Sequence, residues 1–326
     1  MNSLAMAGDT PAAQRRSAVL SFLRKNISFA AFTLMFLFFL LMLRGKFVRF
    51  DNLETILEQS AGLLACAVGV TFVILIGGID LSVGSVVALV GVIAASVLSL
   101  SGNWILAVLA GLAVGVLCGL INGLTHSYLG VPSFIVTLGM LSMARSVTVL
   151  YSGGTVVMIP FDSVLKKFGL SPWMLILALI ITVAGWILQR FTIFGRYALM
   201  IGGDERVALL SGINVRRLKT LVYTVCGLFV AFGGLIIAGR IGSGSPSTGQ
   251  GYELDVISAV VLGGTSLRGG VGGIRGTVLG ALTLSMLNNG LVLMGVASEV
   301  QLLVKGIVLI LAVFISLERD RNEIIK

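Results

Sequence analysis

The residue with the clearest chemical potential is Asp80, in the polar stretch GGIDLSVGS (77–85) between two apolar runs. A carboxylate in this position either carries a proton or an ion, or accepts hydrogen bonds from the free N–H groups of a helix start. We predict the second role: Asp80 or Ser82 caps the helix that follows. The neighbouring glycines let the backbone turn tightly there: Gly77, Gly78 and Gly84.

Catalytic and metal-binding groups are scarce in this sequence. It has one histidine, His126, and three cysteines, Cys66, Cys118 and Cys226, which lie inside apolar runs and are predicted to be small packing residues. No set has metal-ligand spacing, no serine has a histidine base, and no lysine follows the phosphate-binding pattern G-x-x-x-x-G-K-[ST]. We therefore predict no enzyme activity and no cofactor or metal held by this chain.

The composition predicts an integral membrane protein. Hydrophobic residues make up 57% of the 326 residues and charged residues 11%, against about 25% charged in soluble domains. The mean hydropathy is +1.06. We assign the net charge of +9 to basic cytoplasmic loops rather than to nucleic-acid binding.

Apolar runs long enough to cross a bilayer, about 20 residues each, recur along the chain. They predict an all-α polytopic protein of about ten transmembrane helices with broken or re-entrant segments, between a tail at 1–26 and a tail at 317–326. The eighth run is short, and the sequence leaves open whether it crosses fully. The predicted spans are 27–43, 56–76, 83–100, 104–125, 133–151, 173–190, 219–239, 254–264, 276–295 and 299–316.

The distribution of Lys and Arg predicts the orientation of these spans. With the N-terminus inside, fifteen Lys and Arg residues fall on inner segments and six on outer ones. Because basic residues favour cytoplasmic loops, both tails are predicted to be cytoplasmic. Arg145 and Lys305 fall within spans. Arg145 lies near an outer end, where we expect its long side chain to reach the interface.

A second stretch, GGTSLRGG (263–270), is similar to GGIDLSVG (77–84), with four of eight positions identical. Each follows an apolar helix, so we predict two related helix-breaking turns, the second built on Gly263 and Gly264. Both turns fall on the predicted inner side. Paired breaks in apolar segments often mark a transport path.

The fourth span also carries a spacing pattern. Its glycines recur every four residues and share one helix face, which predicts close approach of another helix: Gly111, Gly115, Gly119 and Gly123.

The longest basic loop, near 190–217, contains a short segment with strong helix boundaries. Asp204 is a good N-cap and Gly212 a good left-handed terminator, so a helix of about two turns is predicted between them. A short capped helix with a half-apolar face either docks a partner protein or rests on its own bundle. The residues of this segment that matter for either role are Gly203, Asp204, Glu205, Arg206, Val207, Leu210 and Gly212.

Four stretches carry a family resemblance: GGIDLSVGS, GRYALMIGGDERVALLSGINV, GYELDVISAVVLGGTSLRGGVGGIRGT and LNNGLVLMGV. In order, over about residues 47–316, the chain resembles the ribose-permease-like family of bacterial ATP-binding-cassette (ABC) sugar importer permeases, of the branched-chain amino acid/sugar type. The resemblance implies a multi-pass protein of the bacterial inner (plasma) membrane that imports ribose or another monosaccharide. Its implied partners are a second permease copy or a paralogue, a cytoplasmic ATPase that binds the ATP, and a periplasmic sugar-binding protein.

The resemblance also implies a role for the capped helix. The segment from Gly202 to Gly212 would be the coupling helix that docks on the ATPase. Many relatives have Asn where this chain has Asp204. Both residues cap helices, so the change alters the charge facing the ATPase rather than the fold.

Two rival functions remain at this point. An ion-coupled secondary transporter of a small polar solute would place ionisable groups at mid-membrane, and the apparent absence of buried carboxylates weighs against it. An intramembrane enzyme would need a catalytic constellation, and none is present.

The lining of a sugar path requires hydrogen-bonding groups with little charge. The side chains that fit this description also fit helix–helix hydrogen bonds, the more common role of amides in bundles. The sequence names neither the sugar nor the residues that contact it, and does not separate a homodimer from a heterodimer. The candidates for path lining are Thr71, Asn122, Ser258, Asn288 and Asn289.

Overall fold

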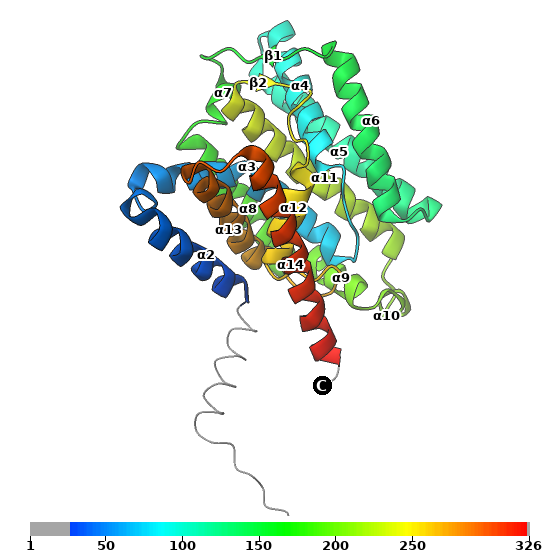
Figure 1. The fold of residues 1–326 in the computed structure, drawn as a ribbon. Coiled ribbons are helices and arrows are strands. Elements are labelled where there is room, and N and C mark those ends of the chain that lie inside the picture. Colours follow the sequence, from blue (N-terminus) through cyan, green and yellow to red (C-terminus); the bar gives the residue numbers. More distant parts are fainter. Residues whose placement is uncertain (1–26, 325–326) are drawn as a thin grey trace, which may run out of the picture.

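The computed structural model describes residues 27–324 and is an all-α bundle (Figure 1). Ten helices correspond to the ten predicted spans, and short elements connect them. The ten are α2 (Ile27–Leu43), α3 (Phe50–Leu75), α4 (Val83–Ser101), α5 (Trp104–Leu129), α6 (Ser133–Ser152), α8 (Trp173–Phe191), α11 (Val215–Ile241), α12 (Tyr252–Leu262), α13 (Ile274–Leu293) and α14 (Ser298–Ile324). The short elements are η1 (Arg44–Lys46), β1 (Val157–Met158), α7 (Val164–Lys167), α9 (Ile193–Gly203), α10 (Glu205–Leu210) and β2 (Ser243–Gly244).

The predicted fold class is confirmed. Within residues 27–324, eight helices are long and apolar enough to cross a membrane. The other two of the ten are α12, which has 11 residues, and α14, which continues to Ile324, past the predicted end of the last span at 316. The predicted tail at 1–26, and the last two residues of the chain, lie outside the described residues.

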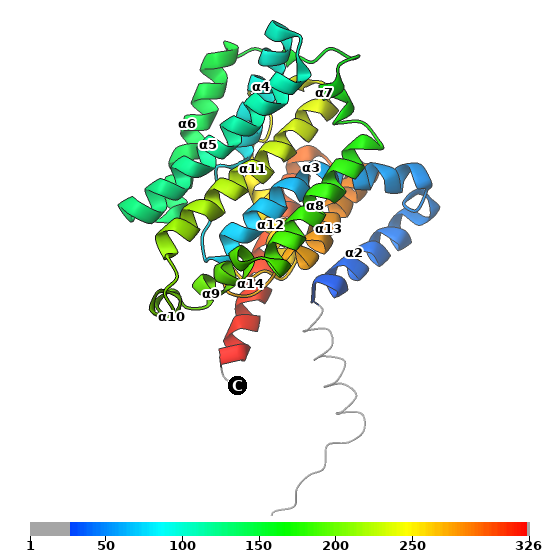
Figure 2. The ribbon, with the colours of Figure 1, turned by 180° about the vertical axis from the view of Figure 1, so that it is seen from behind.

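The start of α2, the end of α14 and the short helix α10 lie at one end of the bundle (Figures 1 and 2). We call this the inner end. The small antiparallel pair of β1 and β2 lies at the opposite, outer end, where Val157 pairs with Gly244. An even number of crossings accounts for this arrangement, and the bias in Lys and Arg predicts that the inner end faces the cytoplasm.

The bundle has a buried centre and an exposed periphery. Most of α3, α4, α11 and α13 is covered by other helices, whereas α2, α5, α6 and α8 leave most of their surface exposed. An apolar helix surface that no protein covers is suited to lipid, so the outer helices are those expected to face the bilayer or another subunit.

The glycine stripe of α5 packs against α11, as its spacing predicts. A Cβ atom on Gly115 would lie 2.6 Å from Cβ of Ala231, and one on Gly123 would lie 2.7 Å from the carbonyl oxygen of Thr220. Real Cβ atoms do not approach so closely. The two helix backbones are therefore in contact along this face, a mode of packing that only small residues allow.

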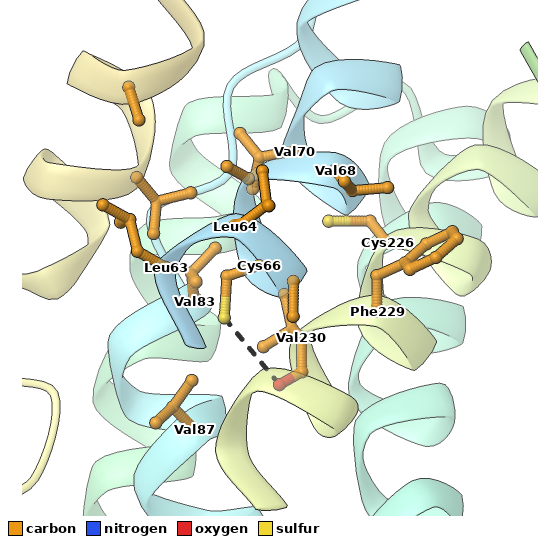
Figure 3. Packing of buried hydrophobic residues seen from close by; sticks show 14 of the residues in the cluster. Leu63, Leu64, Cys66, Val68, Val70, Val83, Val87, Cys226, Phe229 and Val230 are labelled. Carbon is orange, nitrogen blue, oxygen red and sulfur yellow. Dashed lines mark hydrogen bonds between the residues drawn. The ribbon is translucent and has the colours of Figure 1, made fainter. Parts of the chain in front are cut away.

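The cysteines are packing residues, as predicted. All three are buried and unpaired. Figure 3 shows Cys66 on α3 between apolar side chains, with its sulfur directed toward the carbonyl oxygen of Val230 on α11, 4.0 Å away. Cys226 and Phe229 lie beside it on α11. Small side chains at this contact let the two central helices pack closely.

The helix contact yields a direct prediction. Gly123→Ala should lower stability by about 1–3 kcal/mol, because the added methyl group overlaps the backbone of α11. Gly139→Ala on α6 is the matched control, since a Cβ atom there meets nothing within 4 Å. Thermal unfolding of the two purified variants in detergent measures the difference. Equal midpoints would show that α5 and α11 do not pack through this face.

Candidate translocation site

The eighth crossing is half non-helical, built largely of turns, and half helical. After α11 ends, the chain returns beside α4: Gly244 lies against Gly91, and Gly249 lies against Gly84. These two positions on α4 are about 10 Å apart along its axis. The 11 residues of α12 then add about 16 Å. Together these lengths approach the ~30 Å of a bilayer core, so the short eighth run completes a crossing.

The third crossing is broken in the same way from the other side. Residues 76–82 have no helical structure and lead from the inner end of α3 to the start of α4. The two broken crossings meet at Gly84 and Gly249, where a Cβ atom on either glycine would overlap the carbonyl oxygen of the other. Two interrupted segments thus touch backbone to backbone inside the bundle, an arrangement typical of transport sites.

The two glycine turns lie together at the inner end. The N–H of Gly270 donates to the carbonyl of Leu75 at 2.9 Å. Both α3 and α12 end with left-handed glycines, Gly77 and Gly264, and with the hydrogen bonds of a Schellman motif. The structural equivalence therefore pairs Gly77 with Gly264. The sequence match pairs Gly77 with Gly263, so it is offset by one residue from the structural equivalence.

Asp80 does not cap α4, which corrects the prediction. The N-cap residue of α4 is Ser82, whose side chain makes no capping bond. Instead the Asp80 carboxylate accepts hydrogen bonds from the Ser82 N–H at 2.9 Å and the Ser82 hydroxyl at 2.6 Å. The Asp80 residue is only 4% exposed, so it lies inside the bundle rather than at a surface turn.

The surroundings of Asp80 come from helices distant in sequence. Cys226 Sγ of α11 is 3.8 Å from its second carboxylate oxygen, and the Asn122 amide of α5 donates to the Ser82 hydroxyl at 3.1 Å. These contacts tie residues 80–82 to two neighbouring helices. The carboxylate thus fixes the non-helical segment 76–82 in place, because a buried polar group is stable only with such partners.

The other non-helical segment, residues 245–251, is held by Arg145 of α6. Its Nη1 donates to the carbonyl oxygens of Pro246 and Thr248, the latter at 2.8 Å. The prediction that the Arg145 side chain reaches the outer interface is wrong, because its guanidinium binds these backbone carbonyls instead. Glu253 lies half-buried at the start of α12 on the same face.

A charge pair joins α12 to α14. Lys305 Nζ is 2.9 Å from Asp255 Oδ2, and the two side chains are 24% and 18% exposed. Asp255 and Asp80 also show that the bundle contains buried carboxylates. The predicted absence of buried carboxylates is therefore wrong, and it no longer weighs against ion coupling.

The five residues predicted as path lining do not form one surface. Thr71 hydrogen-bonds to Thr277 on α13, and the Asn289 amide donates to Asn52 on α3. Asn122 belongs to the Asp80 cluster. Ser258 is buried in α12, and Asn288 has a buried Oδ1 that makes no hydrogen bond. Three of the five, Thr71, Asn122 and Asn289, therefore make side-chain hydrogen bonds between helices. This is the role that the sequence left open for all five as the alternative to path lining.

The polar face that the structure does assemble lies between α6 and α14. Its side chains come from α6, α12 and α14, and sequence reasoning missed them as a group: Arg145, Glu253, Asp255 and Lys305. The signal was the pair of acidic residues in GYELDV, directly before an apolar run. Charged groups at membrane depth mark functional surfaces.

The short helix α10 has the predicted caps. Asp204 Oδ1 accepts from the N–H groups of Arg206 and Val207 at 2.8 and 3.1 Å. Gly212 is left-handed, and the N–H of Ile213 returns to the carbonyl of Ala208. Ala208 is buried against the bundle, while Leu210 is 87% exposed at the inner end. A rigid helix therefore presents an apolar side chain outward.

The end of α9, directly before this short helix, packs against the inner turns. Gly202, at the end of α9, lies against the carbonyl of Leu75 and the N–H of Gly270, and Gly270 lies against Gly203. Lys219 of α11 forms an ion pair with Glu205 at 2.7 Å. Displacement of α10 would thus reach both broken crossings through backbone contacts.

The charge pair between α12 and α14 gives a test. Lys305→Met leaves the Asp255 carboxylate unpaired and should destabilise the protein by about 2–4 kcal/mol. The double variant Lys305→Met and Asp255→Leu removes both charges and should recover most of that loss. Thermal midpoints of the single and double variants measure the coupling. A double variant as unstable as the single one would show that the pair does not hold α14 to α12.

Known proteins similar to this chain are transport permeases. The "Ribose import permease protein RbsC" of Escherichia coli (strain K12) is 43% identical over 281 residues, covering 84% of this chain and 88% of that protein. The protein of the same name from Bacillus subtilis (strain 168) is 39% identical, covering 86% and 88%. The "Xylose transport system permease protein XylH" of Escherichia coli (strain K12) is 34% identical, covering 91% and 92%.

No solved structure matches this chain. The family described as "Branched-chain amino acid transport system / permease component" matches residues 52–313, which include every helix from α4 to α13. This range, the broken crossings and the similarity to permeases over most of the chain lead to one assignment. The chain is a multi-pass inner-membrane protein that belongs to the branched-chain amino acid transport system permease family.

Proposed function

We propose that this chain is the membrane permease subunit of an ABC importer that carries a monosaccharide, delivered by a periplasmic binding protein and driven by a partner ATPase. Ribose is the first candidate substrate, because the relatives with 39–43% identity are named as ribose permeases. Xylose is the second, from the relative at 34% identity. The observation that carries the proposal is the capped helix α10, which directly follows α9, the helix whose end is in backbone contact with the turns of both broken crossings.

The polar face between α6 and α14 is the proposed path wall. It offers neutral donors and acceptors in the backbone of the non-helical segment, beside three charges that are already hydrogen-bonded or paired: Arg145, Asp255 and Lys305. A sugar needs hydrogen bonds and not a net charge. A second permease copy or a paralogue covering this face would enclose the polar groups between two subunits and keep them from lipid.

The helix α10 is the proposed contact with the ATPase. Its outward side chains, Val207, Leu209 and Leu210, are 55%, 62% and 87% exposed at the inner end. Three such residues on a helix of six are suited to insertion into one groove. The ATPase supplies ATP binding and hydrolysis, and the permease supplies the path.

The coupling role is tested by placing charges on the outward side of α10. Val207→Asp with Leu210→Asp should leave folding intact, because both side chains are exposed. ATPase association should fall at least about a hundredfold, since an unpaired charge in a contact costs several kcal/mol. Binding of the purified ATPase to reconstituted permease measures this effect.

Leu100→Asp is the control for that experiment. Leu100 is 83% exposed at the other end of the bundle, so the same charge there should not affect the ATPase. Normal association and sugar uptake by the α10 variant would make α10 an ordinary surface helix.

The binding protein is proposed to dock at the outer end on basic residues. Lys166 and Lys167 of α7 lie beside Arg240, and Lys166 Nζ is 3.2 Å from the Arg240 carbonyl oxygen. Clustered positive charge at a rim mainly accelerates association with an acidic surface and makes it sensitive to salt.

Neutralising this cluster should therefore change the docking rate. Lys166→Gln, Lys167→Gln and Arg240→Gln together should slow association of the sugar-loaded binding protein about tenfold at low salt and little at high salt. The same number of charges removed at Arg44, Lys46 and Arg49, at the end of α2, serves as the control. Surface plasmon resonance over a salt series reads the rates, and identical slopes for all proteins would reject this docking surface.

A further inference from the structure

A cavity lies at the inner end, away from the polar face. It has a volume of about 790 Å³ and lies between the start of α2, the end of α8, α9 and the start of α13. We call it the inner basic cavity. Its lining includes Ser28, Phe29, Trp186, Arg190, Arg196 and Arg275.

The inner basic cavity has a strong positive charge that nothing in the described part of the chain neutralises. Among the described residues, its lining includes three arginines and no carboxylate. The ion pairs of the described residues all join other side chains. The Arg275 guanidinium stacks over the Trp186 ring, 5.3 Å from its centroid, which orients the cation without removing its charge.

The floor of the cavity is fixed. Gln189 of α8 accepts from the N–H of Ile274 at 2.9 Å and donates to the carbonyl of Gly272 at 3.2 Å. These bonds hold the start of α13 against the end of α8. The arginines therefore project from a rigid frame, and a bound anion would find them already in place.

The position of the inner basic cavity points to its ligand. Trp186 lies five residues before the end of α8, or about 7–8 Å inside that end of the helix. Phe29, on α2, is 55% exposed. A cavity walled by membrane helices, with an aromatic ring inside and arginines at its mouth, has the layout of a lipid headgroup and its upper acyl chains.

We propose that the inner basic cavity binds one anionic phospholipid of the inner leaflet, with its phosphate among Arg190, Arg196 and Arg275 and its upper acyl chains against Phe29 and Trp186. The lipid would fill the space between α2 and α8 and so connect α2 to the central helices. This site is separate from the polar face and from α10, and it does not depend on the proposed sugar substrate.

Tryptophan quenching tests the site in the intact protein. The chain has three tryptophans, so Trp104→Phe with Trp173→Phe leaves Trp186 as the only reporter. This protein is placed in nanodiscs with brominated phosphatidylglycerol or brominated phosphatidylcholine at equal mole fraction. We expect phosphatidylglycerol to quench Trp186 more strongly. Equal quenching by the two lipids would overturn the proposal.

Charge removal identifies the binding groups. In the same background, Arg190→Gln, Arg196→Gln and Arg275→Gln should lower the preference for phosphatidylglycerol on the order of a hundredfold. The matched control, Arg216→Gln, Arg217→Gln and Arg268→Gln, removes three exposed charges from the inner end outside the cavity and should keep the preference. Size-exclusion profiles establish that both variants fold.

Two further outcomes would reject a lipid site. If inorganic phosphate in detergent, without lipid, changes Trp186 fluorescence in an arginine-dependent way and removes the lipid preference, the cavity binds a free anion. If the cavity variant keeps its lipid preference and loses binding to the ATPase, the arginines belong to a protein interface.

Discussion

The backbones of Gly84 and Gly249 touch inside the bundle, and the rest of the structure depends on this contact. Two crossings are interrupted there, one entering from the inner end and one from the outer end. Non-helical backbone inside a membrane is stable only where protein groups satisfy its N–H and C=O groups. Asp80 and Ser82 do so on one side, and Arg145 does so on the other. The bundle needs these polar side chains because the two helices are interrupted.

The same interruption links the two ends of the bundle. The turn after α3 and the turn after α12 meet through the bond between Gly270 and Leu75, and the end of α9 packs against both. The short helix α10 follows directly. Toward the outer end lie the non-helical segment 245–251 and α12, whose Asp255 pairs with Lys305 of α14. A force on α10 thus has a short route to the polar face.

The sequence predicted the features whose causes are local. The number and approximate positions of the spans follow from apolar length, the caps of α10 follow from Asp204 and Gly212, and the α5 packing face follows from glycine spacing. It missed features set by tertiary partners. Asp80 looks like a cap beside its sequence neighbours, but its partners include Cys226 of α11, and Asn122 of α5 bonds to Ser82 beside it. Half of the eighth crossing is not helical, so no helical period marks it or points to Glu253 and Asp255 at its centre.

The buried carboxylates make the energy source the central question, because an ion-coupled transporter would also contain such groups. Family membership and the position of α10 favour ATP. The direct measurement is uptake of labelled ribose and xylose by vesicles that hold the permease with its ATPase and binding protein. The account predicts that uptake needs ATP on the α10 side and continues when ionophores remove proton and sodium gradients. Uptake that continues without ATP and stops with the ionophores would contradict it.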